Sequence, residues 1–151
     1  MKADQTVTLN LPATADYVDI VRLNLYGIAS KMGFSYEDIE DMKVAVSEAC
    51  NNSVLYAYGQ EGGLVEVLFQ VNGEELSITV KDEGVSFALP QQNSSENAPT
   101  LHEKELHDVE IGGLGFYLMQ ALMDDVSVVS ESGKGTQVVL TKRLTRSEEK
   151  V

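Results

Sequence analysis

Two runs of alternating apolar residues on either side of Asn72-Gly73 predict a β-hairpin. Apolar side chains occupy every second position of both runs: Val65, Val67, Phe69, Val71, Leu76, Ile78 and Val80. Alternation with a period of two places such side chains on one face of a sheet. Asn-Gly between two such runs is the strongest short-range hairpin signal. The sequence therefore predicts a sheet with one apolar face, which a second layer has to cover.

The N-terminal third is expected to hold one strand and two helices. Residues 6–11 alternate in the same way as the hairpin, and the proline that follows ends the strand. A first helix is expected from a cap at Thr14 or Asp16 to about Met32, because apolar residues recur at helical spacing. Gly33 then provides a stop signal.

The remaining helices and strands complete one fold class. A second helix is expected from the capping signal of Ser35 and Asp38 to about Ala57. A short helix and two strands are expected near the C-terminus, over residues 114–123, 125–131 and 136–144. This order of elements predicts the α+β class, as a two-layer sandwich of a mostly antiparallel sheet with helices on one face.

Length and composition favour a single domain over residues 1–151. A chain of 151 residues with 43% hydrophobic residues suits one packed core. Residues 88–111 are polar and long for a connection, so we expect them to form a mobile lid. His102 and His107 lie among acidic residues there, which favours a solvated segment over a metal site. The charged residues 145–151 are expected to fray.

The charge balance indicates which partners the chain avoids. There are 24 acidic and 11 basic residues, so the formal net charge is -13. Such a surface repels nucleic-acid phosphates and attracts basic proteins. The first residues lack the apolar segment of a signal peptide, and no apolar run is long enough to cross a membrane. The only cysteine, Cys50, is interpreted as a core residue of a cytoplasmic protein.

Two polar residues interrupt the apolar pattern of the second helix. Glu48 and Asn52 lie four residues apart and therefore project from one side of the helix. Apolar residues flank them on both sides: Val44, Ala45, Ala49 and Leu55. A carboxylate and an amide in such surroundings require partners. Two interpretations remain open from the pattern alone, namely a ligand site or an ordinary polar stripe with an internal hydrogen bond.

Three further motifs combine glycines with polar residues: Asp82-Glu83-Gly84, Gly112-Gly113-Leu114-Gly115 and Gly133-Lys134-Gly135-Thr136. The first follows a strand and is either a turn or a carboxylate directed into a pocket. The second opens a helix, where converging N–H groups favour an anion, and a plain hinge is the alternative. The third is either a hairpin turn or the source of a hydroxyl group that reaches a ligand.

In this order, the motifs resemble those of the GHKL ATPases, which share the Bergerat ATP-binding fold. Within that superfamily the chain is similar to anti-sigma factors of the RsbW type, most clearly in the stretches IEDMKVAVSEACNNSVLYAY, VKDEGVSF and GGLGFYLMQALMDDV. The similarity spans about residues 6–140. Ser86 stands where the superfamily pattern D-x-G-x-G has its second glycine, which matches the anti-sigma branch better than histidine kinases or chaperones.

The resemblance implies a role for each motif. Glu48 would be the general base that takes the proton of a substrate serine, and Asn52 would ligate Mg²⁺ at the ATP phosphates. Asp82 would accept a hydrogen bond from the adenine amino group, and Gly84 would leave room for the ring. Thr136 would support the adenine end through its hydroxyl. The remaining cofactor-binding residues would surround the phosphates with backbone amides: Gly112, Gly113, Leu114 and Gly115.

The resemblance also implies partners and alternatives. The chain would be a homodimeric serine kinase that phosphorylates an anti-anti-sigma factor with Mg-ATP. It would also hold an alternative, stress-response sigma factor inactive by binding it, with Arg22 of the first helix as a candidate contact. One alternative is a non-catalytic module that sequesters the sigma factor and uses nucleotide only to set its shape. Another is an ATPase that hydrolyses nucleotide in water, which in the larger GHKL machines involves a second domain.

Overall fold

The computed structural model describes residues 5–54, 63–83, 114–131 and 135–144. Within them, one sheet has the strand order β1-β2-β3-β5-β4, and every neighbouring pair is antiparallel. The strands are β1 (Gln5–Pro12), β2 (Leu64–Asn72), β3 (Glu75–Asp82), β4 (Asp125–Glu131) and β5 (Gly135–Arg143). The expected lid, residues 88–111, and the expected frayed tail, residues 145–151, lie outside the described residues.

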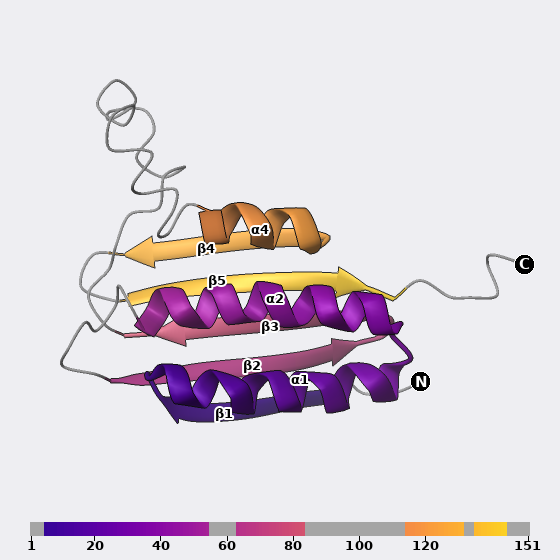
Figure 1. The fold of residues 1–151 in the computed structure, drawn as a ribbon, viewed down its shortest axis with the longest axis horizontal. Coiled ribbons are helices and arrows are strands. Elements are labelled where there is room, and N and C mark those ends of the chain that lie inside the picture. The colour runs from indigo at the N-terminus through magenta and orange to yellow at the C-terminus, as the bar shows by residue number, and fades with distance from the viewer. Residues whose placement is uncertain (1–4, 55–62, 84–113, 132–134, 145–151) are drawn as a thin grey trace, which may run out of the picture.

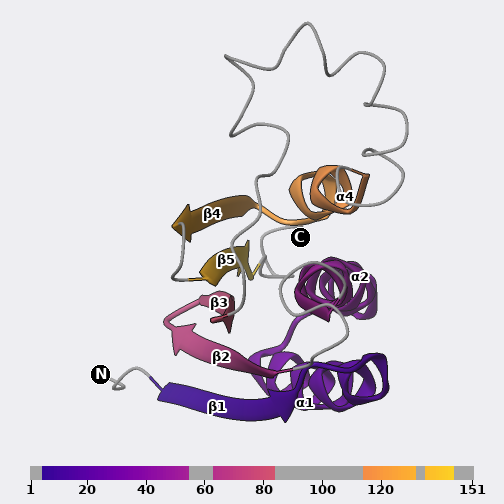
Figure 2. The same cartoon turned by 90° about the vertical axis from the view of Figure 1, so that its left-hand side faces the viewer.

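Three helices cover one face of this sheet (Figures 1 and 2). They are α1 (Val18–Met32), α2 (Tyr36–Asn52) and α4 (Leu114–Leu122), with a short 3-10 helix, η1 (Ala15–Tyr17), before α1. The arrangement confirms the predicted α+β sandwich. No helix of the described segments is long and apolar enough to span a bilayer.

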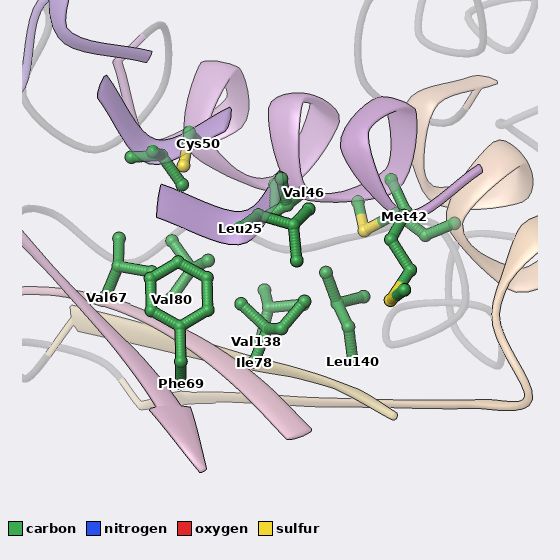
Figure 3. Close-up of a cluster of buried hydrophobic side chains, with 14 of the residues drawn as sticks. Leu25, Met42, Val46, Cys50, Val67, Phe69, Ile78, Val80, Val138 and Leu140 are labelled. Atoms are coloured by element: carbon green, nitrogen blue, oxygen red, sulfur yellow. The ribbon is translucent and has the colours of Figure 1, made fainter. Parts of the chain in front are cut away.

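The core lies between the helices and the sheet. Figure 3 shows strand side chains such as Phe69, Ile78 and Leu140 facing Met42 and Val46 of α2, and all five are fully buried. The strand register aligns the inward-facing residues into rows that cross the sheet. Two of these rows are apolar: Val7–Phe69–Ile78–Leu140–Val126 and Leu9–Val67–Val80–Val138–Val128.

The next row of the inward face changes from apolar to polar. It begins with Leu11 and Val65 and continues with Asp82, Thr136 and Ser130. These three residues lie on β3, β5 and β4, at the edge of the apolar core. A polar patch of this kind requires hydrogen-bond partners, because buried polar groups are costly without them. The register therefore concentrates polar chemistry at one end of the helix–sheet interface.

Several expected boundaries are confirmed by local geometry. Gly33 ends α1 in a left-handed conformation with φ 99°, and its N–H donates to the carbonyls of Ala29 and Ser30. Ser35 caps α2, because its hydroxyl accepts a hydrogen bond from the N–H of Asp38 at 3.1 Å. Glycine tolerates a positive φ and serine is a preferred N-cap, so both signals act as the sequence predicts.

The predicted cap at Thr14 or Asp16 is wrong for the first helix. Thr14 precedes η1 and makes no side-chain capping bond, and α1 begins only at Val18, after Tyr17. The carbonyl of Thr14 instead accepts the N–H of Tyr17 at 3.1 Å, which closes the 3-10 turn. Backbone hydrogen bonds thus do what a side-chain cap was expected to do.

The hairpin turn also differs from expectation. Asn72 is the last paired residue of β2, opposite Glu75, so the turn is Gly73-Glu74 rather than Asn72-Gly73. Gly73 has φ 68° and no described non-glycine residue has a positive φ, as in a type II′ turn with glycine first. The regular part of α2 ends at Asn52, and residue 57, its expected end, lies outside the described residues.

Candidate functional site

The polar row on the sheet is joined to α2 by a buried hydrogen bond. The hydroxyl of Ser53, which follows the last residue of α2, donates to Oδ2 of Asp82 at 2.9 Å. Ser53 and Asp82 are each 4% exposed. A hydrogen bond to an ionised group is stronger than a neutral one, and it offsets part of the cost of burying the carboxylate. The end of α2 and the end of β3 are therefore fixed relative to each other.

The neighbouring strand packs its backbone directly against Asp82. Thr136 is the cross-strand partner of Asp82, and Gly135 precedes it with φ 92°. A Cβ added to Gly135 would overlap the carbonyl oxygen of Asp82 and lie 2.7 Å from Cα of Glu83. Both the left-handed backbone and the close approach require glycine at this position. The backbone around the Asp82 carboxylate is thus tightly constrained.

Thr136 and Ser130 contribute hydroxyl groups to the polar row. Their side-chain oxygens are 3.0 Å apart, and either can be the donor. Thr136 is 4% exposed, on the same inward face as Asp82. The row thus combines one carboxylate with hydroxyl groups that both donate and accept hydrogen bonds. Such a set of groups suits a ligand ring that carries hydrogen-bonding groups along its edge.

The second predicted position on α2, Glu48, lies against the start of α4. A Cβ added to Gly115 would be 2.6 Å from Oε1 of Glu48 and 3.6 Å from its Cβ. The absence of a side chain at Gly115 therefore leaves the space that the Glu48 carboxylate occupies. Glu48 is half-buried, and it forms no ion pair or side-chain hydrogen bond with another described residue.

Asn52 lies on α2 one helical turn after Glu48 and is 4% exposed. Within the described part of the chain its side-chain amide has no hydrogen-bond partner. Buried side-chain amides are normally paired, so an oxygen here suits a cation or a ligand that completes it. No group of three or more His, Cys, Asp or Glu residues gathers in the described ranges. A metal ion at Asn52 would take further ligands from phosphates and water, as Mg²⁺ does.

The structure brings four predicted residues to one end of the helix–sheet interface: Glu48, Asn52, Asp82 and Thr136. Gly115 joins them through its contact with Glu48, and Leu114 is the first residue of α4. The predicted positions Gly84, Gly112 and Gly113 lie outside the described residues. The arrangement combines a carboxylate that has no charged partner among the described residues, a buried amide oxygen and a fixed acceptor on one side of the molecule.

Sequence reasoning missed the serine that connects these groups. Ser53 falls on the same helical face as Met42, Val46 and Ala49, and nothing in the sequence points to its contact with Asp82, 29 residues away. The one available signal was a hydroxyl within an otherwise apolar stripe, which requires a partner when it is buried. Ser130 was missed in the same way, since it reads only as an alternating position of a strand.

Arg22, the predicted partner contact, lies on a different surface from these residues. Its guanidinium pairs with Asp19 and donates to the hydroxyl of Ser47 on α2 at 3.0 Å. Beside it, Leu23 is 68% exposed and Tyr26 is 49% exposed. Asp19, Arg22, Leu23, Tyr26 and Lys43 line an open groove of about 530 Å³ between α1 and α2. Tyrosine and arginine are enriched among the residues that dominate binding at protein interfaces, so Tyr26 beside Arg22 is typical of a protein contact.

Comparisons with known proteins assign the chain to a family. Residues 11–142 match the family described as the histidine kinase-like ATPase domain. The serine-protein kinase RsbW of Bacillus licheniformis is 46% identical over 147 residues, which cover 96% of this chain and 89% of that protein. RsbW of Bacillus velezensis is 45% identical over 91% of this chain and 85% of its own length. RsbW of Bacillus cereus (strain Q1) is 38% identical, with 98% and 91% covered.

Two solved structures share the fold. The crystal structure of the RsbU and RsbW domains of Rv1364c from Mycobacterium tuberculosis superposes with a TM-score of 0.67 at 23% identity. The match covers 94% of this chain and 33% of that one, so the present chain spans a third of its length. The histidine kinase domain of a blue-light activated histidine kinase from Erythrobacter litoralis gives a TM-score of 0.54 at 18% identity, with 89% and 62% covered. At these identities the likeness concerns the fold alone.

Proposed function

Because the chain belongs to the histidine kinase-like ATPase domain family, and within it to the RsbW serine-protein kinases, we propose that it regulates transcription through two protein partners. It is an ATP-dependent serine-protein kinase. Its protein substrate is an anti-anti-sigma factor, which it phosphorylates on a serine. It binds an alternative, stress-response sigma factor as a homodimer and keeps that factor inactive, in the cytoplasm and without contacting nucleic acid.

The observation that carries the proposal is the gathering of unlike polar groups along α2 and the end of the sheet. We call Ser53, Asp82, Thr136 and Ser130 the base end, and Glu48, Asn52 and Gly115 the phosphate end. The base end holds a fixed acceptor, and the phosphate end holds a buried amide oxygen and a carboxylate to which the described segments offer no charged partner. A nucleoside triphosphate has the matching groups, because it carries an amino-purine at one end and a metal-bound triphosphate at the other.

At the base end, Asp82 accepts a hydrogen bond from the adenine amino group. An ionised carboxylate only accepts hydrogen bonds, so it favours a 6-amino purine over a 6-oxo purine. Thr136 supports the same edge of the base through its hydroxyl, and Gly84 leaves space for the ring. The contact between Gly135 and the Asp82 backbone supports this assignment, because it fixes the strand end on which the acceptor stands.

At the phosphate end, Asn52 provides one oxygen ligand to Mg²⁺, which would neutralise the phosphate charge when it is bound. Mg²⁺ keeps several waters and takes few protein ligands, so a single amide oxygen is sufficient. The backbone amides at the start of α4 bind the phosphates, where the helix dipole favours an anion: Gly112, Gly113, Leu114 and Gly115.

Glu48 is the general base of the transfer. It takes the proton from the substrate serine hydroxyl as the serine oxygen bonds to the γ-phosphorus and the bond to the β,γ-bridging oxygen breaks. Phosphoryl transfer depends mainly on positioning and charge stabilisation, so few protein groups are needed. The lack of an ion-pair partner among the described residues supports this role, because the carboxylate is not neutralised by a neighbouring cation.

Arg22 contacts a protein partner on the groove between α1 and α2. The pairing with Asp19 and Ser47 supports this role, because an anchored guanidinium loses less conformational entropy when a partner binds. Exposed Leu23 and Tyr26 supply apolar surface beside it. The contact surface is separate from the nucleotide site, so the chain can bind ATP and a protein at the same time.

The test is transfer of radiolabelled γ-phosphate from Mg-ATP to a purified anti-anti-sigma factor. We expect label on one serine, and none on a variant of that protein in which the serine is alanine. In the same preparation, the chain should bind the alternative sigma factor and block its transcription. Binding of Mg-ATP without any label on the anti-anti-sigma factor would contradict the proposed substrate.

A further inference from the structure

The Ser53–Asp82 hydrogen bond is the one buried side-chain bond between α2 and the sheet among the described residues. The hydroxyl of Ser53 donates to Oδ2 of Asp82 at 2.9 Å, within the normal range for an O–H···O bond. Both side chains are 4% exposed, so water does not compete for this contact. The bond thus fixes the orientation of the Asp82 carboxylate from the helix that also carries Glu48 and Asn52.

We propose that Ser53 is a positioning residue that determines the preference for a 6-amino purine. The inference rests on the proposed function, in which Asp82 receives the amino group of the base. Ser53 does not touch the nucleotide. It acts through Asp82: its hydroxyl donates a hydrogen bond to Oδ2 and so holds the plane of the carboxylate in place.

The chemistry of the carboxyl group explains how this selects a base. An ionised carboxyl only accepts hydrogen bonds, whereas a protonated one carries an O–H donor. A 6-amino purine presents a donor to it, and a 6-oxo purine presents an acceptor. The hydrogen bond from Ser53 fixes the plane of the Asp82 carboxylate, so that its acceptor oxygens are presented in one direction. Ser53 therefore holds Asp82 in the orientation that pairs with adenine and rejects a 6-oxo base.

The surroundings of Ser53 show that its hydroxyl is used for this contact. The last two turns of α2 before it bury apolar residues that include Val46, Ala49 and Cys50. Ser47, a buried serine earlier on α2, accepts a hydrogen bond from Arg22 of α1 instead. The two serines thus share one helix and a similar burial, and they differ in what their hydroxyl groups contact. Ser47 therefore provides a matched control for substitution.

The experiment compares the dissociation constants of ATP and inosine triphosphate, which carries a 6-oxo group in place of the amino group. They are measured by calorimetry for the full chain and for Ser53→Ala, Ser53→Thr and Ser47→Ala. For Ser53→Ala we expect about tenfold weaker ATP binding, with inosine triphosphate binding unchanged or tighter. The preference for ATP should fall by at least that factor. Ser53→Thr keeps the hydroxyl and should retain the preference, and Ser47→Ala should stay within about twofold of the parent chain.

Two outcomes would overturn the inference. A Ser53→Ala chain that keeps the parental preference for ATP would show that Ser53 serves only packing, because a purely structural defect weakens both nucleotides equally. If Ser53→Ala does not fold, Ser53→Cys is used, since cysteine has nearly the same size as serine and its thiol is only a weak donor. An unchanged preference for ATP in Ser53→Cys would likewise show that Ser53 serves only packing. Asp82→Asn separates this result from a failure of the proposed function. If the parent chain binds no ATP, or if Asp82→Asn keeps the full preference, the proposed site itself is wrong.

Discussion

The base end of the site, around Asp82, is built from strands, whereas the phosphate end, around Glu48, forms where two helices meet. At the base end, a hydrogen bond from Ser53 and the backbone contact with Gly135 constrain the acceptor. At the phosphate end, the described structure gives Glu48 and Asn52 no polar partners, and Gly115 only leaves space. One end is thus preorganised by the protein, and in the proposed function the other would be completed by the ligand and its metal ion.

This difference has an energetic consequence for substitutions. Changes at the base end disturb contacts that belong to the fold, so they should alter both stability and nucleotide binding. Changes at the phosphate end remove groups that act on the bound phosphates, so they should alter the rate and leave the free energy of unfolding nearly unchanged. Three substitutions, each with a matched control, separate these expectations.

The largest effect is expected for Glu48→Gln, which removes the proposed base and keeps the size of the side chain. Phosphate transfer to the anti-anti-sigma factor should fall by roughly 10²–10⁴-fold. The dissociation constant of Mg-ATP and the midpoint of unfolding should change little, because Glu48 has no polar partner in the described structure. Glu40→Gln on the same helix is the control, since Glu40 pairs with Lys43 at the surface. Transfer that persists in Glu48→Gln would remove this residue from the role of base.

Gly135→Ala tests the preorganised base end. The new Cβ would overlap the Asp82 carbonyl oxygen at a positive φ, so we expect a loss of roughly 3 kcal/mol or more in the free energy of unfolding, with weaker ATP binding. Gly73→Ala is the matched control. Gly73 also has a positive φ, of 68°, but nothing lies within 4 Å of an added Cβ. It should cost only about 1–2 kcal/mol in urea unfolding and leave ATP binding intact. Equal losses at both glycines would argue against a constrained Asp82.

Gly115→Ala tests the phosphate end by displacing Glu48 without changing it. The added Cβ would lie 2.6 Å from Oε1 of Glu48, which is the mobile tip of its side chain. We expect phosphate transfer to fall about tenfold, because small misplacements of reacting groups are costly. The thermal midpoint should stay the same or rise, since alanine is the better helix former. Gly27→Ala in α1 adds the same methyl group in open space. It should raise the free energy of unfolding by about 0.5–1 kcal/mol without affecting phosphate transfer. Unaltered phosphate transfer in Gly115→Ala would show that the space at Gly115 does not position Glu48 for the reaction.

The smallest effect at neutral pH concerns Cys50, which lies on α2 between Glu48 and Ser53. Burial raises the pKa of its thiol from 9.0 to about 12, with the charge of Arg22 opposing the shift. An unfolded thiol ionises near pH 9 and the folded one does not, so this contribution to stability is complete below pH 9 and is lost as the pH rises from 9 to about 12. Cys50→Ala should lack this part of the pH dependence in chemical unfolding.

The same thiol reports whether the helix that joins the two ends opens. In the folded chain at pH 8, we expect reaction with a thiol reagent only at the rate at which the core opens, because the buried thiol remains protonated. Saturating Mg-ATP should slow the reaction further, since the ligand stabilises the closed state. Fast labelling without nucleotide would contradict a preorganised α2.

The sequence predicted the layers of this fold because they depend on local periodicity. The alternating runs around residue 72 identified β2 and β3, and Ser35 and Gly33 identified helix ends. The turn was predicted one residue too early because an Asn-Gly pair favours two left-handed positions, whereas only Gly73 adopts a positive φ. The start of α1 was predicted wrongly because backbone hydrogen bonds close the turn before it. Such bonds do not depend on particular side chains, so the sequence gives no signal for them.

The site was predictable only in part, for the same physical reason. Glu48, Asn52, Asp82 and Thr136 were identified from their resemblance to a known set of motifs, and their convergence required the three-dimensional structure. The contacts that hold the site together join distant segments, as Ser53 and Asp82 do over 29 residues. Periodicity carries no information on such pairs. The space that Gly115 leaves for Glu48 likewise depends on how α2 and α4 pack.

A crystal structure of the chain with Mg²⁺ and a non-hydrolysable ATP analogue tests the account most directly. We predict that the adenine amino nitrogen lies within about 3 Å of the Asp82 carboxylate. The metal ion should lie about 2.1 Å from the side-chain oxygen of Asn52. A nucleotide bound with its base away from Asp82, or with its phosphates away from α2 and the start of α4, would contradict the single site on which the proposed function depends.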